Sequence, residues 1–447
     1  MRSPVAATQI RRFLALLALM AVVELITGPP GSAEEPTIGI TRSFSEPTSF
    51  FGLFVTPRFV LFFAFTVIIY LVASLWRSQS TSIVAIWNTT TAQPRAFTQR
   101  RAVRLSTRGG LLVIAIVLPL IVTDPFWQSS LVEQIAVYIL LALGLNVVTG
   151  FAGLLDLGYV AFYAIGAYAT AWVTGALPLA PPFGIHMDPF FAIPIAIVLA
   201  MVAGVILGAP TLRLRGDYLA IVTLGFGEII ALFANNLNTI TGGATGTNEI
   251  PHFTFHVGPV NYRWGLGPVP YYYLALGFVV IFIVAFSLLE HSRVGRAWTA
   301  IREDEVAAES VGINPLKYKV MAFAIGAASA GFAGVMTAAQ TNFVSPATFT
   351  LVFSINILVL VIFGGMGSIA GVILGAVLVQ TFQMFIIHTP PAGFQPQDLY
   401  IYLGAILVAM MIFRPAGLLP SRRRRRELTM AEVGKSTAGE ILIGEQS

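Results

Sequence analysis

One stretch decides the class of fold: Leu131-Val-Glu-Gln-Ile-Ala-Val-Tyr-Ile-Leu-Leu-Ala-Leu-Gly-Leu-Asn-Val-Val148. Its apolar residues fall on every side of a helix, without the apolar–polar alternation of a membrane-barrel strand. A helix needs about 20 mostly apolar residues to cross a hydrocarbon core about 30 Å thick. The stretch therefore indicates a transmembrane helix, and segments of the same kind recur along the chain.

The composition extends this conclusion to the whole chain. Of its 447 residues, 56% are hydrophobic and only 11% are charged, against about 25% charged residues in an average soluble domain. The mean hydropathy is +0.81. So few charges cannot cover a soluble protein of this size, and the sequence predicts an all-α polytopic membrane protein with about 10 to 12 transmembrane helices. The net charge of +5 is attributed to the membrane, and no nucleic acid is expected as a partner.

The predicted spans are the apolar segments of the chain, and several of them need flanking residues to reach full length. They are Phe13–Ile26, Phe59–Leu75, Leu111–Thr123, Leu131–Val148, Asp156–Thr174, Pro189–Leu207, Tyr218–Ala234, Tyr271–Leu289, Val320–Ala339, Pro346–Phe363, Ile369–Ile387 and Leu399–Phe413. A basic, polar linker follows the second span. We therefore predict a two-helix unit with its linker over residues 1–110, a ten-helix core over residues 111–420 and a basic tail over residues 421–447.

The basic residues predict the orientation, because Lys and Arg are retained on the cytoplasmic side of a membrane. With the N-terminus inside and the spans alternating, 23 of the 26 basic residues fall on the inner side. The exceptions are Arg42, Arg58 and Arg263. Both termini are therefore expected in the cytoplasm, and the loop of residues 235–270 is expected outside.

The first apolar segment has a second interpretation. Arg11 and Arg12, an apolar run and small residues near Gly31-Ser32-Ala33 also resemble a secretory signal peptide. The charge distribution favours a retained span, because the count of basic residues depends on this segment crossing the membrane.

The sequence lacks the patterns of disulfide bonds, nucleotide hydrolysis and metal binding. Cys is absent, which excludes disulfides and thiolate metal sites. The triplet Gly434-Lys435-Ser436 lacks the earlier glycine of a phosphate-binding loop and no strand precedes it, so we expect no ATP hydrolysis by this chain. His252 and His256 are four apart, but Pro251 and Gly258 flank them in a loop, which disfavours a metal site.

Two acidic residues fall within the predicted core spans. Glu133 stands near the end of its span and is expected at the interface. Glu228 stands in the middle of its span, where a charge is costly and is usually functional or paired. We favour structural pairing, with a place on a translocation path or a proton relay as the alternatives.

The longest charged stretch between two core spans covers residues 290–319. Within it, Glu303-Asp304-Glu305 stand where the first turn of a helix is stabilised by negative charge. Gly312 suits the left-handed residue that ends a helix, and Pro315 follows shortly after. The pattern predicts a short helix from Asp304 to Val311 on the cytoplasmic side.

The same stretch carries a resemblance to a known family. Residues 306–312 resemble the Glu-Ala-Ala-x-x-x-Gly coupling motif of ABC importer permeases, with the Glu one place early at Glu305. The wider segment Gly295-Arg-Ala-Trp-Thr-Ala-Ile-Arg-Glu-Asp-Glu305 resembles the LivM-type permeases for branched-chain amino acids. Three further stretches resemble the same family: Leu214–Glu228, Gly364–Gly371 and Arg414–Pro420. The resemblance covers about residues 111–426 and makes the core an ABC permease core.

This resemblance implies a division of labour among subunits. A periplasmic binding protein captures an amino acid, a second, LivH-like permease completes the path, and two ATP-binding subunits use ATP and Mg²⁺. The permease itself binds no cofactor and lies in the bacterial inner membrane. The implied coupling residues are Arg296, Arg302, Glu305, Ala307, Ala308, Gly312 and Pro315. The small Ala307 and Ala308 would let the ATPase surface approach closely.

The translocation path is expected at two glycine-rich segments, residues 150–158 and residues 364–371. Their weak similarity suggests an internal repeat. Irregular backbone at membrane depth lines a cavity or is buried in protein, and it could offer amides and carbonyls to a zwitterion. Close helix packing through small residues is the alternative, and re-entrant segments would change the number of spans. The candidate path residues are Gly153, Asp156, Gly158, Thr223, Glu228, Gly242, Gly243, Gly365 and Gly367.

The sequence thus predicts a permease subunit of an ATP-driven importer for leucine, isoleucine and valine. Urea or short-amide import is the alternative within the family, because residues 241–246 read Thr-Gly-Gly-Ala-Thr-Gly where the family tends to have Asn at the fifth position. An ion-coupled secondary carrier is disfavoured by the few mid-membrane charges, and a membrane-embedded enzyme by the absence of a His/Asp/Glu cluster in the sequence.

Overall fold

The computed structural model describes residues 101–181, 184–211, 217–257, 260–265, 267–389, 398–413 and 417–419. These residues divide into two compact units. One holds residues 101–111, 385–389 and 398–409, and the other holds the remaining described residues. All candidate site residues lie in the second unit. The predicted spans Phe13–Ile26 and Phe59–Leu75 and the tail of residues 421–447 lie outside the described residues, and the predicted domain boundaries stay predictions.

Each of the ten predicted core segments coincides with helix, which the uniformly apolar sequence favours because only intra-segment hydrogen bonds satisfy the backbone in lipid. The helices are α4 (Arg101–Ile121), α5 (Pro125–Ser130), η1 (Leu131–Ala136), α6 (Val137–Leu145), η2 (Asn146–Phe151), α7 (Val160–Thr174), α8 (Pro189–Thr211), α9 (Asp217–Asn236), α10 (Asn238–Thr241), η4 (Gly243–Thr245), α11 (Pro268–His291), α12 (Arg293–Glu303), α13 (Glu305–Ser310), α14 (Pro315–Thr341), η5 (Pro346–Thr348), α15 (Leu351–Gly364), α16 (Ile369–His388) and α17 (Asp398–Phe413). Within the described residues, six helices are long and apolar enough to cross a membrane, and Gly109–Ile121, Val160–Thr174 and Leu351–Gly364 are shorter apolar helices.

Two departures from plain α-helix bear on the arrangement of the spans and loops. The span of residues 125–151 is continuous, but η1 and η2 are π-helical turns within it. In the predicted external loop, β1 (Thr254–Val257) and β2 (Val260–Arg263) pair as an antiparallel hairpin. An isolated antiparallel bridge also joins Thr247 to Val344, and both β features fall outside the spans.

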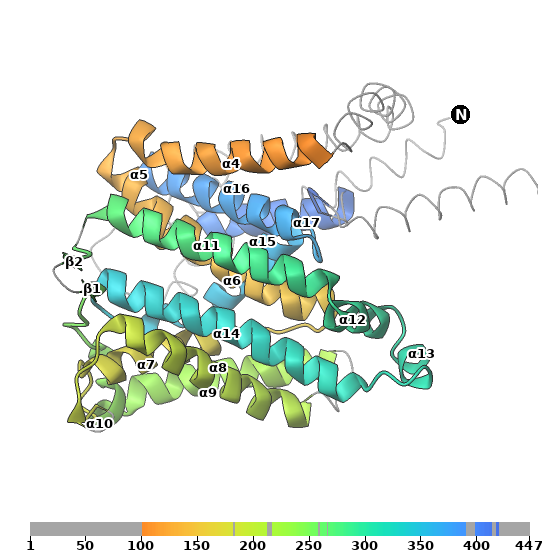
Figure 1. Cartoon of the computed structure of the whole chain (residues 1–447). Helices are drawn as coiled ribbons and strands as arrows, with labels where there is room; N and C mark the ends of the chain where they lie inside the picture. The colour runs from red at the N-terminus through yellow and green to blue at the C-terminus, as the bar shows by residue number, and fades with distance from the viewer. Residues whose placement is uncertain are drawn as a thin grey trace, which may run out of the picture. The chain divides into compact units, whose positions relative to one another are not determined.

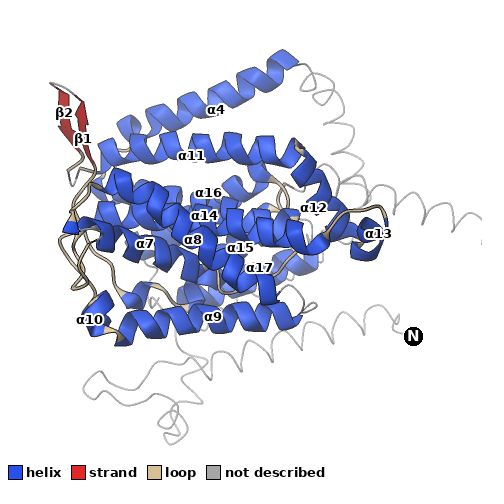
Figure 2. Ribbon diagram, turned by 60° about the horizontal axis from the view of Figure 1, so that its bottom comes forward, coloured by secondary structure: helices blue, strands red, loops and turns tan. Residues whose placement is uncertain are grey.

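The helices of the second unit run between two ends (Figure 1). We call these the α12 end, where α12 and α13 lie, and the hairpin end, where α10 and the β1–β2 hairpin lie, as Figure 2 also shows. The basic residues described at the α12 end are Arg293, Arg296, Arg302, Lys317 and Lys319, and Arg263 is at the hairpin end. The charge separation predicted from the sequence is therefore also a separation in space within this unit.

Helix α14 is at the centre of the packing of the second unit, in contact with α6, α7 and α8. Its small residues let the neighbouring backbones approach. A Cβ added at Gly331 would lie 2.6 Å from the Cβ atom of Ala200 on α8, and one added at Gly166 on α7 would lie 2.5 Å from the Cα atom of Gly331. Such close contacts matter in lipid, where no hydrophobic effect drives apolar helices together.

We expect Gly331→Leu to disrupt this three-helix contact, since a Cβ there already lies 2.6 Å from the Ala200 Cβ atom and 3.0 Å from the Ala196 carbonyl oxygen of α8. Overpacking a tight core typically destabilises by about 1–3 kcal/mol, and here the lost contacts span three helices. Gly277 on α11 provides the matched control, because nothing lies within 4 Å of a Cβ added there. Thermal unfolding in detergent should show a lower Tm for Gly331→Leu only. Equal Tm values for the two variants would contradict the packing described.

Candidate functional site

The short helix predicted in the charged stretch is present as α13. The hydroxyl of Ser292 accepts two backbone N–H groups of the first turn of α12, at 3.1 and 3.2 Å. The carboxylate of Asp304 does the same for α13, at 2.9 and 3.0 Å. Gly312 follows α13 with φ at +86°, the left-handed conformation that favours glycine. Both the helix and its glycine terminus are confirmed.

Two side-chain contacts brace α12 and α13 against the start of α14. The indole of the fully buried Trp298 donates to the carbonyl oxygen of Tyr318 at 2.7 Å. The ammonium of Lys319, whose side chain is only 10% exposed, pairs with Glu305 at 2.6 Å. Glu305, the acidic residue of the coupling motif, is therefore used within the chain, and α12, α13 and α14 form one braced region.

The outer surface of α13 differs from the predicted one. Ala308 is 3% exposed and packs within the chain, so the expectation that it lies against another surface is wrong, whereas Ala307 is exposed. Val306 and Val311 are 72% and 75% exposed instead. Sequence reasoning missed these two valines, although large apolar side chains in a charged stretch outside the spans were a usable signal.

The remaining residues of the coupling prediction have local roles in the chain. Arg296 is exposed on α12 and donates to the carbonyl oxygen of His291 at 3.0 Å. Pro315 is in the first turn of α14, where its fixed φ suits a helix start, beside the capping Asn314. The side chain of Arg302, at the end of α12, instead makes contacts outside the braced region.

Arg302 reaches both glycine-rich segments. Its guanidinium donates to the carbonyl oxygen of Gly150. A Cβ added at Gly153 would lie 2.7 Å from its Cγ atom, and one added at Gly367 would lie 3.1 Å from its Nη1 atom. The two glycine segments, more than 200 residues apart in sequence, meet at the α12 end under one side chain.

The two segments also contact each other directly. The backbone N–H of Gly367 donates to the side chain of Asn146, in the π-helical turn η2, at 2.8 Å. A Cβ added at Gly150 would lie 2.5 Å from the nitrogen of Gly367. Gly365 and Gly367 have φ of +118° and +81°, so their turn depends on glycine. Both segments connect successive helices at the α12 end, and neither adds a span.

The first glycine segment continues inward as irregular backbone. The N–H of Leu157 donates to Thr223 on α9 at 3.1 Å, and the N–H of Gly158 donates to Asp156 at 3.0 Å. Asp156 and Thr223 are 1% and 0% exposed. These contacts satisfy a backbone that enters the helix bundle before α7 begins at Val160, as lipid-excluded irregular structure requires.

The structure therefore brings six of the predicted path residues together and separates the other three. The six lie in the two glycine segments or contact them on α9: Gly153, Asp156, Gly158, Thr223, Gly365 and Gly367. Glu228 lies instead on the exposed side of α9. Gly242 and Gly243 are at the hairpin end, where they have φ of +80° and +63°.

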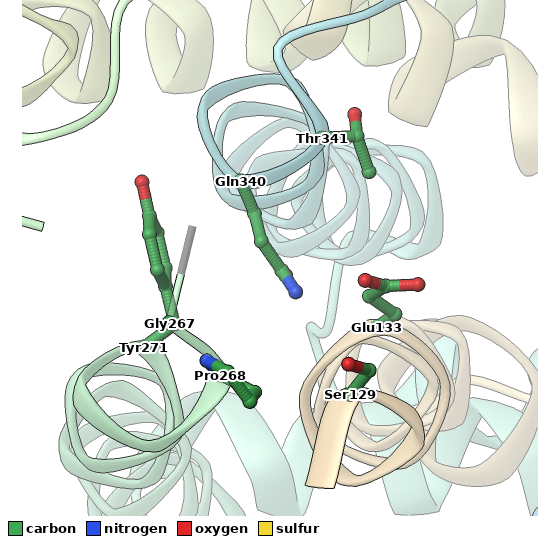
Figure 3. Close-up of a pocket in the computed structure, with 7 residues that line it drawn as sticks. All are labelled: Ser129, Glu133, Gly267, Pro268, Tyr271, Gln340 and Thr341. Atoms are coloured by element: carbon green, nitrogen blue, oxygen red, sulfur yellow. The ribbon is translucent and has the colours of Figure 1, made fainter. Parts of the chain in front are cut away.

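The hairpin end carries two hollows. One, of about 580 Å³, is open and is lined by residues that include Ala176, Gly242, Thr247 and Glu249. The other, of about 250 Å³, is lined by Ser129, Glu133, Gly267, Pro268, Tyr271, Gln340 and Thr341 (Figure 3). Glu133 is thus exposed at this hollow, in η1, eight residues after the span begins at Pro125 and not at its end as predicted from the sequence.

His252 has a packing role next to the second hollow. Its Nδ1 lies 3.0 Å from the Tyr271 hydroxyl oxygen and 2.9 Å from the carbonyl oxygen of Ala339. The ring therefore joins the loop before β1 to α11 and α14. Within the described residues, no three His, Asp or Glu side chains are grouped as metal ligands would be.

Sequence comparison identifies the relatives of this chain. Residues 129–413 match the family described as "branched-chain amino acid transport system / permease component". The chain is 40% identical over 336 residues to the LivM permease protein of Salmonella typhimurium and 41% identical over 336 residues to that of Escherichia coli K12, which covers 71% of this chain and 75% of each relative. It is 23% identical over 296 residues to LivH of Salmonella typhimurium, covering 63% of this chain and 91% of LivH. No solved structure matches.

Proposed function

The chain belongs to the family of permease components of branched-chain amino acid transport systems, and on this premise we propose that it is one of two permease subunits of a high-affinity importer of leucine, isoleucine and valine. It is a transport subunit of an ABC system and not its ATPase. ATP and Mg²⁺ would be bound by partner subunits, and this chain would carry the amino acid across the membrane.

The proposed assembly has four kinds of subunit. A periplasmic binding protein delivers the amino acid, this chain and a LivH-like permease form the path, and two ATP-binding subunits drive it. The similarity of the chain to LivH over 91% of that relative supports two permeases built on one plan. The assembly would lie in a bacterial inner membrane with the α12 end and both termini in the cytoplasm. The basic residues at the α12 end support this orientation.

One observation carries the proposed mechanism: the continuity from α13 to the glycine segments. α13 is braced to α12 and α14 by Trp298 and by the Glu305–Lys319 pair. From the end of α12, Arg302 binds the turn at Gly150, and Gly367 lies against the same turn. Motion of an ATPase bound at α13 would therefore reach both glycine turns without passing through a flexible loop.

The exposed Val306 and Val311 are the proposed ATPase contacts. They are large apolar groups on a charged surface outside the spans, which is typical of a protein contact rather than of a solvated face. Ala307 lies between them on the exposed side of α13 and leaves room for close approach. Arg296 lies on the preceding helix and would form the charged edge of the same contact.

The glycine turns are the proposed moving part of the path. Six residues, Gly153, Asp156, Gly158, Thr223, Gly365 and Gly367, form or support them. Gly242 and Gly243 would act at the outer side, where the open hollow offers a place for solute release from the binding protein. An internal repeat relating the two glycine segments stays a prediction.

Two alternative functions differ from this proposal, one in the substrate and the other in the energy source. Import of urea or a short amide would use the same architecture with another solute. An ion-coupled carrier would need no ATPase, and the braced α13 surface, which is of no use to such a carrier, argues against it.

Uptake by the reconstituted transporter tests the proposed function. In proteoliposomes with the LivH-like subunit, the ATP-binding subunits and the binding protein, we expect ATP-dependent accumulation of leucine and none of urea. Urea accumulation would identify the alternative within the family. Leucine accumulation driven by a proton or sodium gradient without ATP would identify a secondary carrier.

Charge placed on the α13 surface should break the ATPase contact. We expect Val306→Asp and Val311→Asp to lower co-purification of the ATP-binding subunits and ATP-driven leucine uptake at least tenfold, which corresponds to about 1.4 kcal/mol. Neither residue is buried, so the variants should insert normally. Ile185→Asp is the matched control, since this residue is 56% exposed between α7 and α8, away from the α12 end. Full ATPase retention by both valine variants would exclude this surface.

A further inference from the structure

Helix α9 has one face packed in the chain and one face open. Thr223 and Gly227 are buried against the first glycine segment, with a Cβ added at Gly227 lying 3.2 Å from the Cα atom of Gly158. The other side is exposed. We define the open face of α9 as Ile221, Gly225, Glu228, Ile229 and Leu232, whose spacing puts them on one side of a helix.

The open face contains a carboxylate in the middle of an apolar surface. Ile221, Ile229 and Leu232 are 64%, 50% and 56% exposed. Glu228 is also exposed, and among the residues that the structure describes it has no ion-pair partner. At Gly225, nothing lies within 4 Å of an added Cβ, so the face is notched one turn from the carboxylate.

The position of Glu228 along α9 disfavours lipid as the neighbour of this face. Eleven residues separate it from Asp217 and eight from Asn236, the two ends of α9. At 1.5 Å per residue these are about 16 and 12 Å, beyond the reach of a glutamate side chain. A carboxylate at that depth costs at least about 2.5 kcal/mol against hydrocarbon. We therefore expect protein or water to cover the open face.

Other exposed helix faces in the same unit behave differently. On α11, Ile281, Val284 and Leu288 are 59%, 52% and 70% exposed and no charge stands among them. Such a surface suits lipid acyl chains. The open face of α9 differs from the α11 surface because it has a carboxylate far from both helix ends and a glycine one turn away. Surfaces that line a transport path or contact another helix have this composition.

We propose that the open face of α9 meets the second permease subunit across the translocation path, and that the carboxylate of Glu228 binds the ammonium group of the passing amino acid. The inference rests on the proposed function and adds to it a helix, a partner surface and an atom for substrate recognition. A zwitterion crossing a low-dielectric region needs an acidic acceptor for its ammonium group. Glu228 provides one, and among the described residues no cation pairs with it.

The same helix connects this acceptor to the coupling region. Thr223 accepts a hydrogen bond from the N–H of Leu157. Gly227, the residue before Glu228, packs against Gly158. The first glycine segment in turn lies under Arg302. A shift of that segment would therefore displace α9 and alter the exposure of Glu228, as alternating access requires.

Cysteine labelling tests the position of the open face. The chain has no cysteine of its own, so Leu232→Cys on α9 and the equally exposed Ile281→Cys on α11 are unique sites. In the assembled transporter, with cysteine-free partners, a small water-soluble thiol reagent should label Leu232→Cys and a lipid-soluble maleimide should label Ile281→Cys. Labelling of Leu232→Cys from lipid only, or by neither reagent, would overturn the proposal. Cross-linking of Leu232→Cys to a second copy of this chain would also overturn it.

Substitution of the carboxylate tests its role. We expect Glu228→Gln to lower ATP-driven leucine uptake at least tenfold while the subunits still co-purify, and Glu228→Asp to restore part of the rate. Glu290→Gln, the same change at an exposed position in the last turn of α11, should transport normally. Loss of assembly in Glu228→Gln would assign the residue to a structural ion pair, and normal uptake would exclude an ammonium site. Failure of the unmodified transporter to take up leucine would instead contradict the proposed function, so the two failures are distinguishable.

Discussion

The backbone of the turn at Gly150 and the backbone of Gly367 lie too close for any side chain between them, and the guanidinium of Arg302 holds the pair. A Cβ at Gly150 would lie 2.5 Å from the Gly367 nitrogen, and the carbonyl oxygen of Gly150 is the acceptor for Arg302. Much of the described architecture follows from this junction. It fixes the end of the span of residues 125–151 against the turn between α15 and α16, and it ties both to the braced region of α12 and α13.

From the junction, irregular backbone leads into the helix bundle. A membrane protein tolerates such backbone only where its polar groups are satisfied away from lipid. Here the satisfying groups are specific: Thr223 binds the N–H of Leu157, and Asp156 binds the N–H of Gly158. Because Thr223 belongs to α9, the segment and that helix are mechanically joined. The coupling surface, the glycine turns and the helix that carries Glu228 thus form one chain of direct contacts.

Much of this could be predicted from the sequence, because it depends on local rules. Apolar length predicted the core spans, and the negative charge of residues 303–305 together with the terminating Gly312 predicted α13. What failed depended on tertiary contacts. Ala308 was expected on a surface but is buried, because the fold turns that side of α13 inward. Glycine segments were recognised by composition, yet their meeting under Arg302 joins positions that no spacing rule connects. The exposed side of α9 likewise became visible only once Thr223 was seen packed on the other side.

The central claim is that the coupling region and the glycine turns move as one body because Arg302 joins them. It is tested by the distance between spin labels at Glu309→Cys on α13 and Met366→Cys in the second turn, both exposed positions of a chain without native cysteine. Pulsed electron paramagnetic resonance would measure it in the reconstituted transporter with cysteine-free partners. We predict the same distance in the ATP-free and ATP-bound states. A change of several ångström between those states, with leucine uptake intact, would contradict the account.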